Sequence, residues 1–452
     1  MDGRCLTSKI DKYKANCSTL VRNPDDTEAL VDQFALISDV KRNRRHYAPL
    51  AKRAYNIDPT DITNVFNYAS ALNRIGDFEK ALQLYLTCEK LADEAWMPWI
   101  LHHIGVSYRH LGENYKAIDY YERAYKAHPE PMFLKDRALA IMATGRLSEG
   151  LKAFEVRREI AAERVKRNSG ELLVSQQKLP AGVVHWEGED LTGKTVVVYH
   201  EEGSGDFMMF CRFIPKLRER GVAKILLCGP MPDLLDLVGD NIHIDGIVPL
   251  SGPFECDYVI GSMSLPWRCD VELDCVDGAP YFKADRAKIP LRGKLNVGLV
   301  WRGNPQYGTD EQRSFDFTTY CPLFDIPGVA FYSLQKGAPA IEVTDLGYDG
   351  FIANLEPYAK SWRETAKLIQ ALDVVVTVDT AVAHLAGALG KPVFILVTVA
   401  SDWRWNRNSR KSIWYDSATV IRQKREDDWS PCIKAVHEAL RGMVDDRRRQ
   451  AA

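Results

Sequence analysis

The turn between an expected strand and an expected helix carries side chains suited to binding an anion. Residues 373–397 read DVVVTVDTAVAHLAGALGKPVFILV, and the apolar, β-branched run Val374–Val378 predicts a buried strand. The Ala-rich run Ala381–Leu389 predicts a helix, which Gly390 and Pro392 end. Free N–H groups and the positive dipole at the start of a helix favour phosphate. The residues expected at this anion site are Asp379, Thr380 and, one turn into the helix, His384.

A second turn, HEEGSGDFMMFCRFIPKL at 200–217, offers a candidate general base. Gly203 and Gly205 allow the backbone to turn tightly, and Asp206 is expected to cap the following helix. Its carboxylate could also take a proton from an acceptor hydroxyl at the rim of a cleft. Capping alone is the plainer interpretation. The competing bases in this stretch are His200, Glu201 and Glu202.

Basic and polar side chains follow two further expected strands. An arginine suits phosphate oxygens because its guanidinium can donate two parallel hydrogen bonds, although a surface arginine is usually only solvated. Glutamine and lysine at a strand end could meet a base or a ribose, and loop polarity explains them equally well. The residues concerned are Arg302, Asn304 and Arg313 in VGLVWRGNPQYGTDEQRSFDF, and Gln335 and Lys336 in YSLQKG.

Residues 400–423 interleave aromatic and basic side chains. Such a mixture can bind nucleic acid or a sugar ring, whereas aromatic core anchors beneath a charged surface are an equally good interpretation. Asp402 and Trp403 could also line the cleft that holds the anion. The other aromatic and basic residues of the stretch are Trp405, Trp414, Tyr415, Arg404, Arg407, Arg410 and Lys411.

The elements that must position these side chains alternate between strands and helices from residue 195 onward. This alternation predicts parallel sheets covered on both faces, and it restarts after Lys294 to give two doubly wound halves. Ligands of such folds bind at the carboxyl ends of the strands. The expected strands are 195–199, 224–228, 242–249, 258–260, 296–301, 329–334, 374–378 and 393–397, with helices at 207–220, 231–238, 361–371 and 431–443.

The chain before residue 155 has the phased small and aromatic residues of a helical repeat. Gly76 and Gly112 are 36 residues apart and Gly145 follows 33 later, which brackets the tetratricopeptide period of about 34. Small and aromatic side chains recur in the same phase, where they let paired helices approach. An unrelated helical bundle is the alternative. Those side chains are Ala69, Ala81, Tyr85, Ala117, Tyr121 and Ala124.

Composition fits a protein of two or three globular domains. The 452 residues carry a net charge of −2, which gives no overall attraction to nucleic acid or to an anionic membrane. No run approaches the roughly 20 apolar residues of a membrane span, and MDGRCLTSKIDKYK lacks the apolar core of a signal peptide. The ten cysteines are scattered without a CxxC pair or a metal-ligand spacing, so we expect reduced thiols, no metal and a cytoplasmic location.

Taken together, these blocks resemble a known family. Beside the turns above, they include WEGEDLTGK, SMSLP at 262–266 and DWRW at 402–405. Their order resembles bacterial and phage tetratricopeptide-repeat glycosyltransferases with a GT-B fold. It is similar to the ADP-heptose heptosyltransferases and, distantly, to the O-linked N-acetylglucosamine transferases. The resemblance implies a multidomain chain, all-α tetratricopeptide-like repeats followed by an α/β GT-B fold of two Rossmann-like domains. The implied boundaries are repeats at 1–165, a connector at 166–181, an acceptor-side domain at 182–293 and a nucleotide-sugar-binding domain at 294–452.

The resemblance also implies transfer of a sugar from a UDP-, GDP- or ADP-linked donor, without a cofactor or a required metal. In heptosyltransferase-like members the aspartate of the Gly-Asp loop is the base, which corresponds to Asp206, and the acidic-Thr turn binds donor phosphates. Arg302 or Arg313 would offset diphosphate charge, and the sequence does not decide between them. The implied donor residues are Arg302, Asn304, Arg313, Gln335, Lys336, Asp379, Thr380, Ala381, His384, Asp402 and Trp403. The acceptor-side residues are Glu202, Gly203, Ser204 and Gly205, where EEGSGD replaces the family's Glu-Gln-Gly-Leu-Gly-Asp.

Other functions fit parts of the same sequence. A phage-type DNA glycosyltransferase acting on hydroxymethylated bases would use the stretch 400–423, with Arg404, Arg407 and Arg410 on the DNA. A non-catalytic tetratricopeptide scaffold would keep the fold without binding a donor. A lipopolysaccharide heptosyltransferase is a third alternative, although it does not explain the repeats. Acceptors left open are a protein, a peptide, a glycan or modified DNA, and a homo-oligomer is compatible with the sequence.

Overall fold

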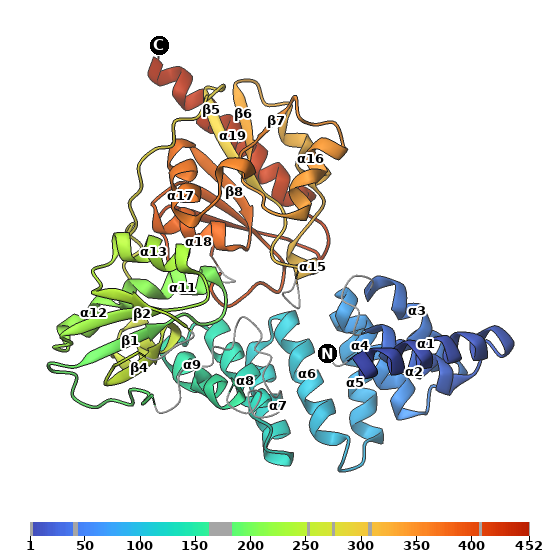
Figure 1. The fold of residues 1–452 in the computed structure, drawn as a ribbon. Coiled ribbons are helices and arrows are strands. Elements are labelled where there is room, and N and C mark those ends of the chain that lie inside the picture. The colour runs from blue at the N-terminus through green and yellow to red at the C-terminus, as the bar shows by residue number, and fades with distance from the viewer. Residues whose placement is uncertain are drawn as a thin grey trace. The chain divides into compact units, whose positions relative to one another are not determined.

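The computed structural model describes residues 3–38, 44–161, 183–250, 254–273, 276–305, 310–405 and 409–451 (Figure 1). The chain forms two compact units, Met1–Thr144 and Gly145–Ala452. The predicted connector at 166–181 lies outside the described residues. The domain boundaries inferred from the family resemblance stay predictions.

The first unit consists of helices joined by short turns. At two of these turns the glycines Gly76 and Gly112 adopt φ values of 88° and 80°, which a residue with a side chain rarely takes. Asp77 then caps the next helix by accepting the Lys80 N–H. The helices are α1 Gly3–Arg22, α2 Thr27–Ser38, α3 Arg44–Ile57, α4 Ile62–Ile75, α5 Phe78–Leu91, α6 Met97–Leu111, α7 Asn114–Ala127 and α8 Pro131–Ala143.

Small residues against aromatic rings hold these helices together, as the repeat pattern predicts. A Cβ on Gly105 would lie 2.8 Å from the ring of Tyr121, so α6 can approach α7 only because this residue is glycine. Tyr85 and Tyr121 are fully buried, and Ala69, Ala81 and Ala117 are buried around them. The predicted tetratricopeptide-like hairpins are thus confirmed.

The second unit starts with a short helical segment and a four-stranded parallel sheet of order β3-β2-β1-β4 (Figure 1). Val197 of the central strand is opposite Leu226 and Val259. The strands are β1 Thr195–Tyr199, β2 Lys224–Cys228, β3 Gly246–Val248 and β4 Tyr258–Gly261. The helices are α9 Leu147–Ala153, α11 Ser204–Phe210, α12 Pro215–Glu219, α13 Pro232–Asn241 and α14 Leu265–Arg268.

One helix of this half differs from the prediction. The single helix expected at 207–220 begins earlier, at Ser204, and is divided by a 3-10 turn at Cys211–Phe213. Pro215 follows the interruption, and a proline disfavours helix continuity because it lacks an N–H donor and clashes with the preceding turn.

The second sheet has six parallel strands of order β10-β9-β8-β5-β6-β7. All five residues of its strand β8 are buried, as its β-branched run predicts. The strands are β5 Leu295–Val300, β6 Val329–Ser333, β7 Ile352–Asn354, β8 Val374–Val378, β9 Val393–Val397 and β10 Ala418–Arg422. The helices are α15 Asp310–Arg313, α16 Glu342–Asp345, α17 Trp362–Ala371, α18 Ala381–Ala388 and α19 Ser430–Ala451.

Several contacts join the two sheets within the second unit. Helices α11 and α18 pack together, as do α13 and α17. The segment between the sheets also bonds to both halves: the N–H groups of Tyr281 and Phe282 donate to the Ala388 carbonyl at 3.0 and 2.9 Å, and the Tyr281 hydroxyl donates to the Met208 carbonyl at 2.8 Å. Helical repeats followed by two parallel-sheet halves confirm the predicted fold class and are consistent with a GT-B-like fold.

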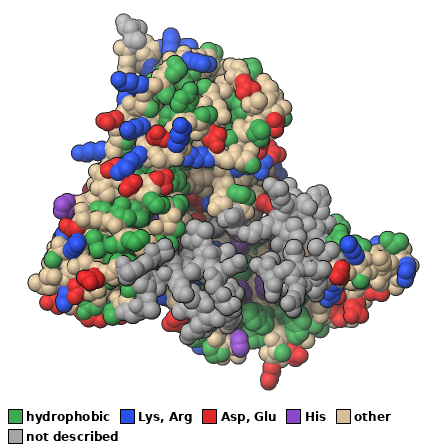
Figure 2. All heavy atoms as spheres, viewed as in Figure 1, with side chains coloured by type: hydrophobic (Ala, Val, Ile, Leu, Met, Phe, Trp, Pro, Cys, Tyr) green, Lys and Arg blue, Asp and Glu red, His purple; other side chains and the backbone are tan. Residues whose placement is uncertain are grey.

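Acidic and basic side chains are interspersed on the face shown in Figure 2, in keeping with the small net charge. Among the helices of the described residues, none combines the length and the apolar character needed to cross a bilayer.

Glycine is required near the end of α18, and this can be tested. A Cβ on Gly387 would overlap the buried ring of Tyr415, whereas a Cβ on Gly442 in α19 would meet nothing within 4 Å. We expect Gly387→Ala to lower the free energy of unfolding by about 1–3 kcal/mol. The matched control Gly442→Ala should raise it by up to about 1 kcal/mol, because alanine favours the helix. Thermal denaturation of the full chain measures both. Equal midpoints for the two variants would contradict the packing of Tyr415 on α18.

Candidate functional site

The two predicted turns meet where the first helices after β1 and β8 begin. Helix α11 starts after Gly203 and α18 starts after Thr380. A Cβ on Gly205 would lie 2.5 Å from His384 Cδ2 and 3.3 Å from Ala381 Cα. Only glycine therefore allows this approach, which brings the acceptor-side turn of one sheet onto the anion turn of the other.

Asp206 lies at this contact but does not occupy the predicted N-cap position. Gly203 is the N-cap of α11, and Asp206 is three residues further on, where its Oδ2 accepts the Gly203 N–H at 2.9 Å. The expectation that Asp206 begins the helix is thus wrong by one turn, because the helix starts at Ser204. The other carboxylate oxygen, Oδ1, forms an ion pair with Arg404.

Arg404 is the charged group to which several carboxylates converge. Its Nη1 donates to Asp402 Oδ1 at 2.6 Å and its guanidinium lies 4.4 Å from the centroid of the Trp403 ring. The side chain is only 13% exposed. Burial opposes its charge, but the carboxylates of Asp206 and Asp402 outweigh burial and raise the pKa of Arg404. Sequence reasoning considered Arg404 for nucleic acid or sugar binding and as part of the DWRW block, and it missed this ion pair with Asp206.

Asp379 and His384 lie on either side of the start of α18, and their pKa values are shifted in opposite directions. Burial raises the pKa of Asp379, the charge of Arg313 opposes this rise, and Asp402 adds to it. Burial, helped by the charge of Arg404, lowers the pKa of His384 to about 3, so the imidazole is neutral at pH 7. Its Nδ1 lies 2.9 Å from the Tyr415 hydroxyl. A hydrogen-bonded neutral ring is thus what the structure holds at His384.

Thr380 and Ala381 complete the turn. Thr380 has extended backbone as the N-cap residue, and its Oγ1 lies 3.0 Å from Thr377 Oγ1. Ala381 is the first residue of α18 and faces Gly205. The first backbone N–H groups of α18 are therefore positioned at the carboxyl end of β8, as an anion site requires.

The structure separates the two arginines that the sequence left as alternatives. Arg302 pairs with Asp316 and, at 2.9 Å, with Glu342. Arg313 pairs with Asp310 at 2.9 Å, and its charge affects the pKa of both Asp379 and His384. Of the two, Arg313 is thus the arginine whose charge acts on Asp379 and His384 at the start of α18.

The polar side chains after β5 and β6 differ in their surroundings. Gln335 is 3% exposed, and its Oε1 accepts the N–H groups of Trp301 and Arg302 at 3.0 and 2.9 Å. Its Nε2 donates to backbone carbonyls as well, so its amide is used within the protein. Lys336 is exposed and lies 5.9 Å from the centroid of the Trp362 ring, and Asn304 is exposed in the loop after β5.

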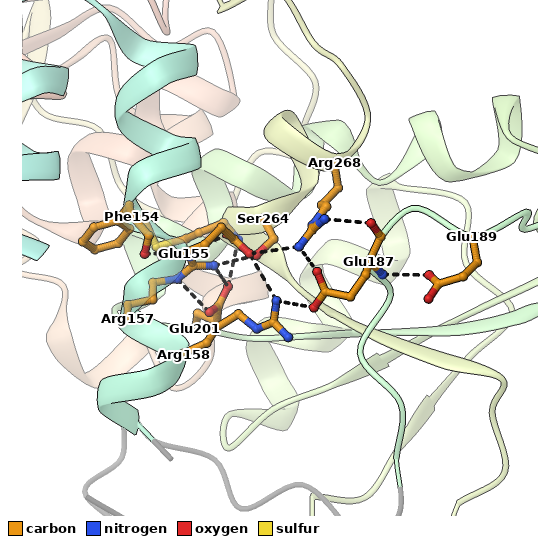
Figure 3. A network of polar contacts seen from close by, with 10 residues as sticks. Phe154, Glu155, Arg157, Arg158, Glu187, Glu189, Glu201, Ser264 and Arg268 are labelled. Carbon is orange, nitrogen blue, oxygen red and sulfur yellow. Dashed lines mark hydrogen bonds and ion pairs between the residues drawn. The ribbon is translucent and has the colours of Figure 1, made fainter. Parts of the chain in front are cut away.

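The acceptor-side turn has a constrained backbone. Glu202 has a φ of 52°, in the left-handed region, and Ser204 Oγ lies 3.4 Å from Met231 Sδ. Burial lowers the pKa of His200 to about 4, and Glu201 is bound by Arg157 (Figure 3). Of the competing bases, Glu201 is therefore already committed to an ion pair.

The aromatic side chains of the stretch 400–423 form core rather than a binding surface. Trp403, Trp405, Trp414 and Tyr415 are at most 8% exposed. Arg407 lies outside the described residues. Within the part of this stretch that the structure describes, no tryptophan or tyrosine is available to stack on nucleic acid bases, so the aromatic-core interpretation holds.

Helical repeats followed by two parallel α/β halves that pack together through α11 and α18 are consistent with one class, a repeat protein with a GT-B-like unit. Residues 351–438 match glycosyltransferase family 9 (heptosyltransferase), and residues 100–131 match the tetratricopeptide repeat. These matches confirm the predicted resemblance to tetratricopeptide-repeat glycosyltransferases. They support glycosyltransferase activity and, through the repeats, protein binding.

Individual proteins similar to the chain cover it to different extents. It is 25% identical over 454 residues to Protein FlbA of Caulobacter vibrioides, covering 92% of this chain and 73% of that protein. The solved structure of MamA is 20% identical with a TM-score of 0.31, covering 37% of this chain and 98% of MamA. The structure of the TPR protein YrrB is 16% identical with a TM-score of 0.28, covering 32% of this chain and 75% of YrrB.

The buried neutral state of His384 predicts a pH dependence of stability. Its pKa is about 3 in the folded chain and roughly 6.5 when unfolded, so the unfolded chain binds the extra proton between these values. This difference contributes fully to the free energy of unfolding above about pH 6.5. The contribution is lost as the pH falls towards about 3. We expect His384→Gln to flatten this loss by up to about 1.4 kcal/mol per pH unit. Urea unfolding between pH 7 and 4 measures the slope. The exposed His243→Gln serves as the control, and an unchanged slope in His384→Gln would contradict the assignment.

Proposed function

We propose that the chain transfers a sugar from a nucleotide-activated donor to an acceptor hydroxyl, with inversion at the anomeric carbon. The observation that carries the proposal is the contact of α11 with α18 through Gly205 and His384. Because Asp206 directly follows Gly205, we propose that its carboxylate and the start of α18 act on one substrate. A candidate base and an anion-stabilising helix terminus are thereby within reach of one substrate.

The proposed reaction is a direct displacement. Asp206 accepts the proton of the acceptor hydroxyl while that oxygen forms a bond to the anomeric carbon. The bond between the anomeric carbon and the donor phosphate oxygen breaks, and its electrons leave with the nucleoside diphosphate. The N–H groups at the start of α18 and the guanidinium of Arg313 stabilise the developing charge. Asp379 and Thr380 orient the donor at this turn.

Arg404 is suited to act on both substrates in this scheme. Two of its nitrogens bond to Asp402 and Asp206, and its Nε has no hydrogen-bond partner among the described residues. The positive charge of this group would attract the diphosphate of the donor. Cationic side chains and helix amides then supply the stabilisation that a metal gives in other transferases, so we propose a metal-independent reaction.

The acceptor is proposed to be a protein or peptide presented by the helical repeats. The repeat match supports this choice, since tetratricopeptide repeats bind proteins. The buried aromatic side chains of 400–423 remove the main support for a DNA acceptor. The proposed setting is the cytoplasm, with the cysteines reduced.

Donor binding comes first in the test of this function. Thermal shift with UDP-, GDP- and ADP-sugars should raise the melting temperature for at least one nucleotide, since a ligand that binds only the folded chain stabilises it. A chain that responds to none of the donors would be a scaffold rather than a transferase.

Substitution of Asp206 then tests the base. We expect Asp206→Asn to lower kcat by about 10²- to 10⁴-fold, because the amide cannot take up the proton. Donor affinity should change much less than kcat, because the single amide oxygen can keep the hydrogen bond from Gly203 or from Arg404 and the start of α18 is not altered. The exposed Asp445→Asn is the matched control and should leave both quantities unchanged. Full turnover by Asp206→Asn would exclude Asp206 as the base.

A further inference from the structure

A buried arginine outside both sheets binds the turn that carries Asp206. Arg157 follows the 3-10 turn Phe154–Val156, in the segment between the helical repeats and β1, and is 6% exposed. Its Nε donates to Glu201 Oε1 and its Nη2 to Glu201 Oε2, both at 3.0 Å (Figure 3). This is the two-pronged geometry in which a guanidinium fixes both the position and the orientation of a carboxylate.

The remaining donors of Arg157 are also engaged. Nη1 donates to Glu155 Oε1 at 2.8 Å and to the Phe154 carbonyl at 3.2 Å, and Nη2 also donates to Ser264 Oγ at 2.7 Å. Ser264 in turn donates to Glu155 at 2.7 Å. Burial opposes the charge of Arg157, and the carboxylates of Glu201 and Glu155 outweigh burial and raise its pKa. The guanidinium is thus held rigidly at all three nitrogens.

Glu201 is fixed from a second direction as well. Its Oε2 accepts the Met263 N–H at 3.0 Å. A Cβ on Gly261, at the end of β4, would overlap its carboxylate, so that strand end leaves just enough room for it. The segment at 157, the end of β4 and the start of the turn after β1 therefore converge on one carboxylate.

The turn that follows Glu201 needs such an anchor. Glu202 has a φ of 52°, which residues with a side chain adopt rarely and at a cost. Gly203 comes next as the N-cap of α11, and the Gly203 N–H donates to the carboxylate of Asp206. The direction in which the Asp206 carboxylate points therefore depends on a strained turn that begins at Glu201.

We propose that Arg157 is a positioning residue that holds the turn 200–206 and so orients Asp206. Its importance for catalysis rests on the proposed function of Asp206, whereas its hold on the turn does not. In this proposal the segment that contains Arg157, between the repeats and β1, contributes to catalysis by orienting Asp206. A residue that only attached this segment to the sheet would leave the turn and the reaction unaffected once folding was preserved.

Arg157→Lys in the full chain separates these possibilities, because lysine keeps the charge and loses the paired donors. We expect kcat to fall by at least about 10-fold, with donor affinity within about twofold of wild type. Hydrogen exchange of the amides at 200–210 should accelerate by at least about 10-fold, and that of β8 should not change. Arg146→Lys, whose arginine pairs with Glu149 on the surface of the same segment, is the control and should show neither effect.

Glu201→Gln provides a second route to the same result, should Arg157→Lys fail to fold. The amide keeps the shape and loses the charge, so it should reproduce the exchange and kcat changes. Combining both substitutions should add little to either, because they remove one interaction. Unchanged hydrogen exchange of the amides at 200–210 in both variants would overturn the proposal. The proposal would also be overturned if kcat and donor affinity both fell in proportion to the loss of stability, because that is the result of general destabilisation. A wild-type chain without turnover on any sugar nucleotide would refute the proposed function alone, since the exchange measurement still decides the role of Arg157.

Discussion

The approach of α11 to α18 at Gly205 is the constraint on which the rest of the site depends. It brings together two helix starts, and both present positive dipole ends. Such ends repel unless negative charge lies beside them. Asp206 lies in the first turn of α11, Asp379 directly precedes Thr380 at the start of α18, and Asp402 adds a third carboxylate close by. The carboxylates therefore make the helix contact tolerable before any substrate is considered.

Two arginines complete the charge balance that this contact sets up. Arg404 and Arg313 carry positive charge against the carboxylates, and their charges also act on the neutral, buried His384. Breaking a buried pair of this kind on one side leaves an uncompensated charge, which costs about 3–5 kcal/mol. Charge at the site is thus fixed by the fold, and a donor diphosphate would enter an environment that is already organised. This is the condition under which electrostatic stabilisation is most effective.

Most strands that sequence reasoning located are largely buried, although the exposed edge strand β3 was also predicted, over the longer range 242–249. Strand β8 was predicted at its observed bounds because its β-branched run matches a central parallel strand. Strands β7 and β10 were not predicted, since they are the two edges of their sheet and carry weaker patterns. In the site, Asp206 and Asp379 could each be predicted from the sequence of the turn that carries it. Their meeting depends on a missing side chain at Gly205, and no spacing along the chain records it. The ion pair between Arg404 and Asp206 was unpredictable for the same reason.

The ion pair raises the question of whether Asp206 can still receive a proton. A carboxylate has two oxygens and about four lone-pair positions. In this structure Oδ1 faces Arg404 and Oδ2 accepts from Gly203, so part of its accepting capacity remains for a hydroxyl. Both existing partners are donors that fix the carboxylate and leave lone pairs free to accept from a hydroxyl. The turn 200–206 that carries Asp206 is itself held through Glu201. An acceptor hydroxyl would therefore meet a carboxylate whose direction is set before binding, which lowers the entropic cost of reaching the reactive geometry.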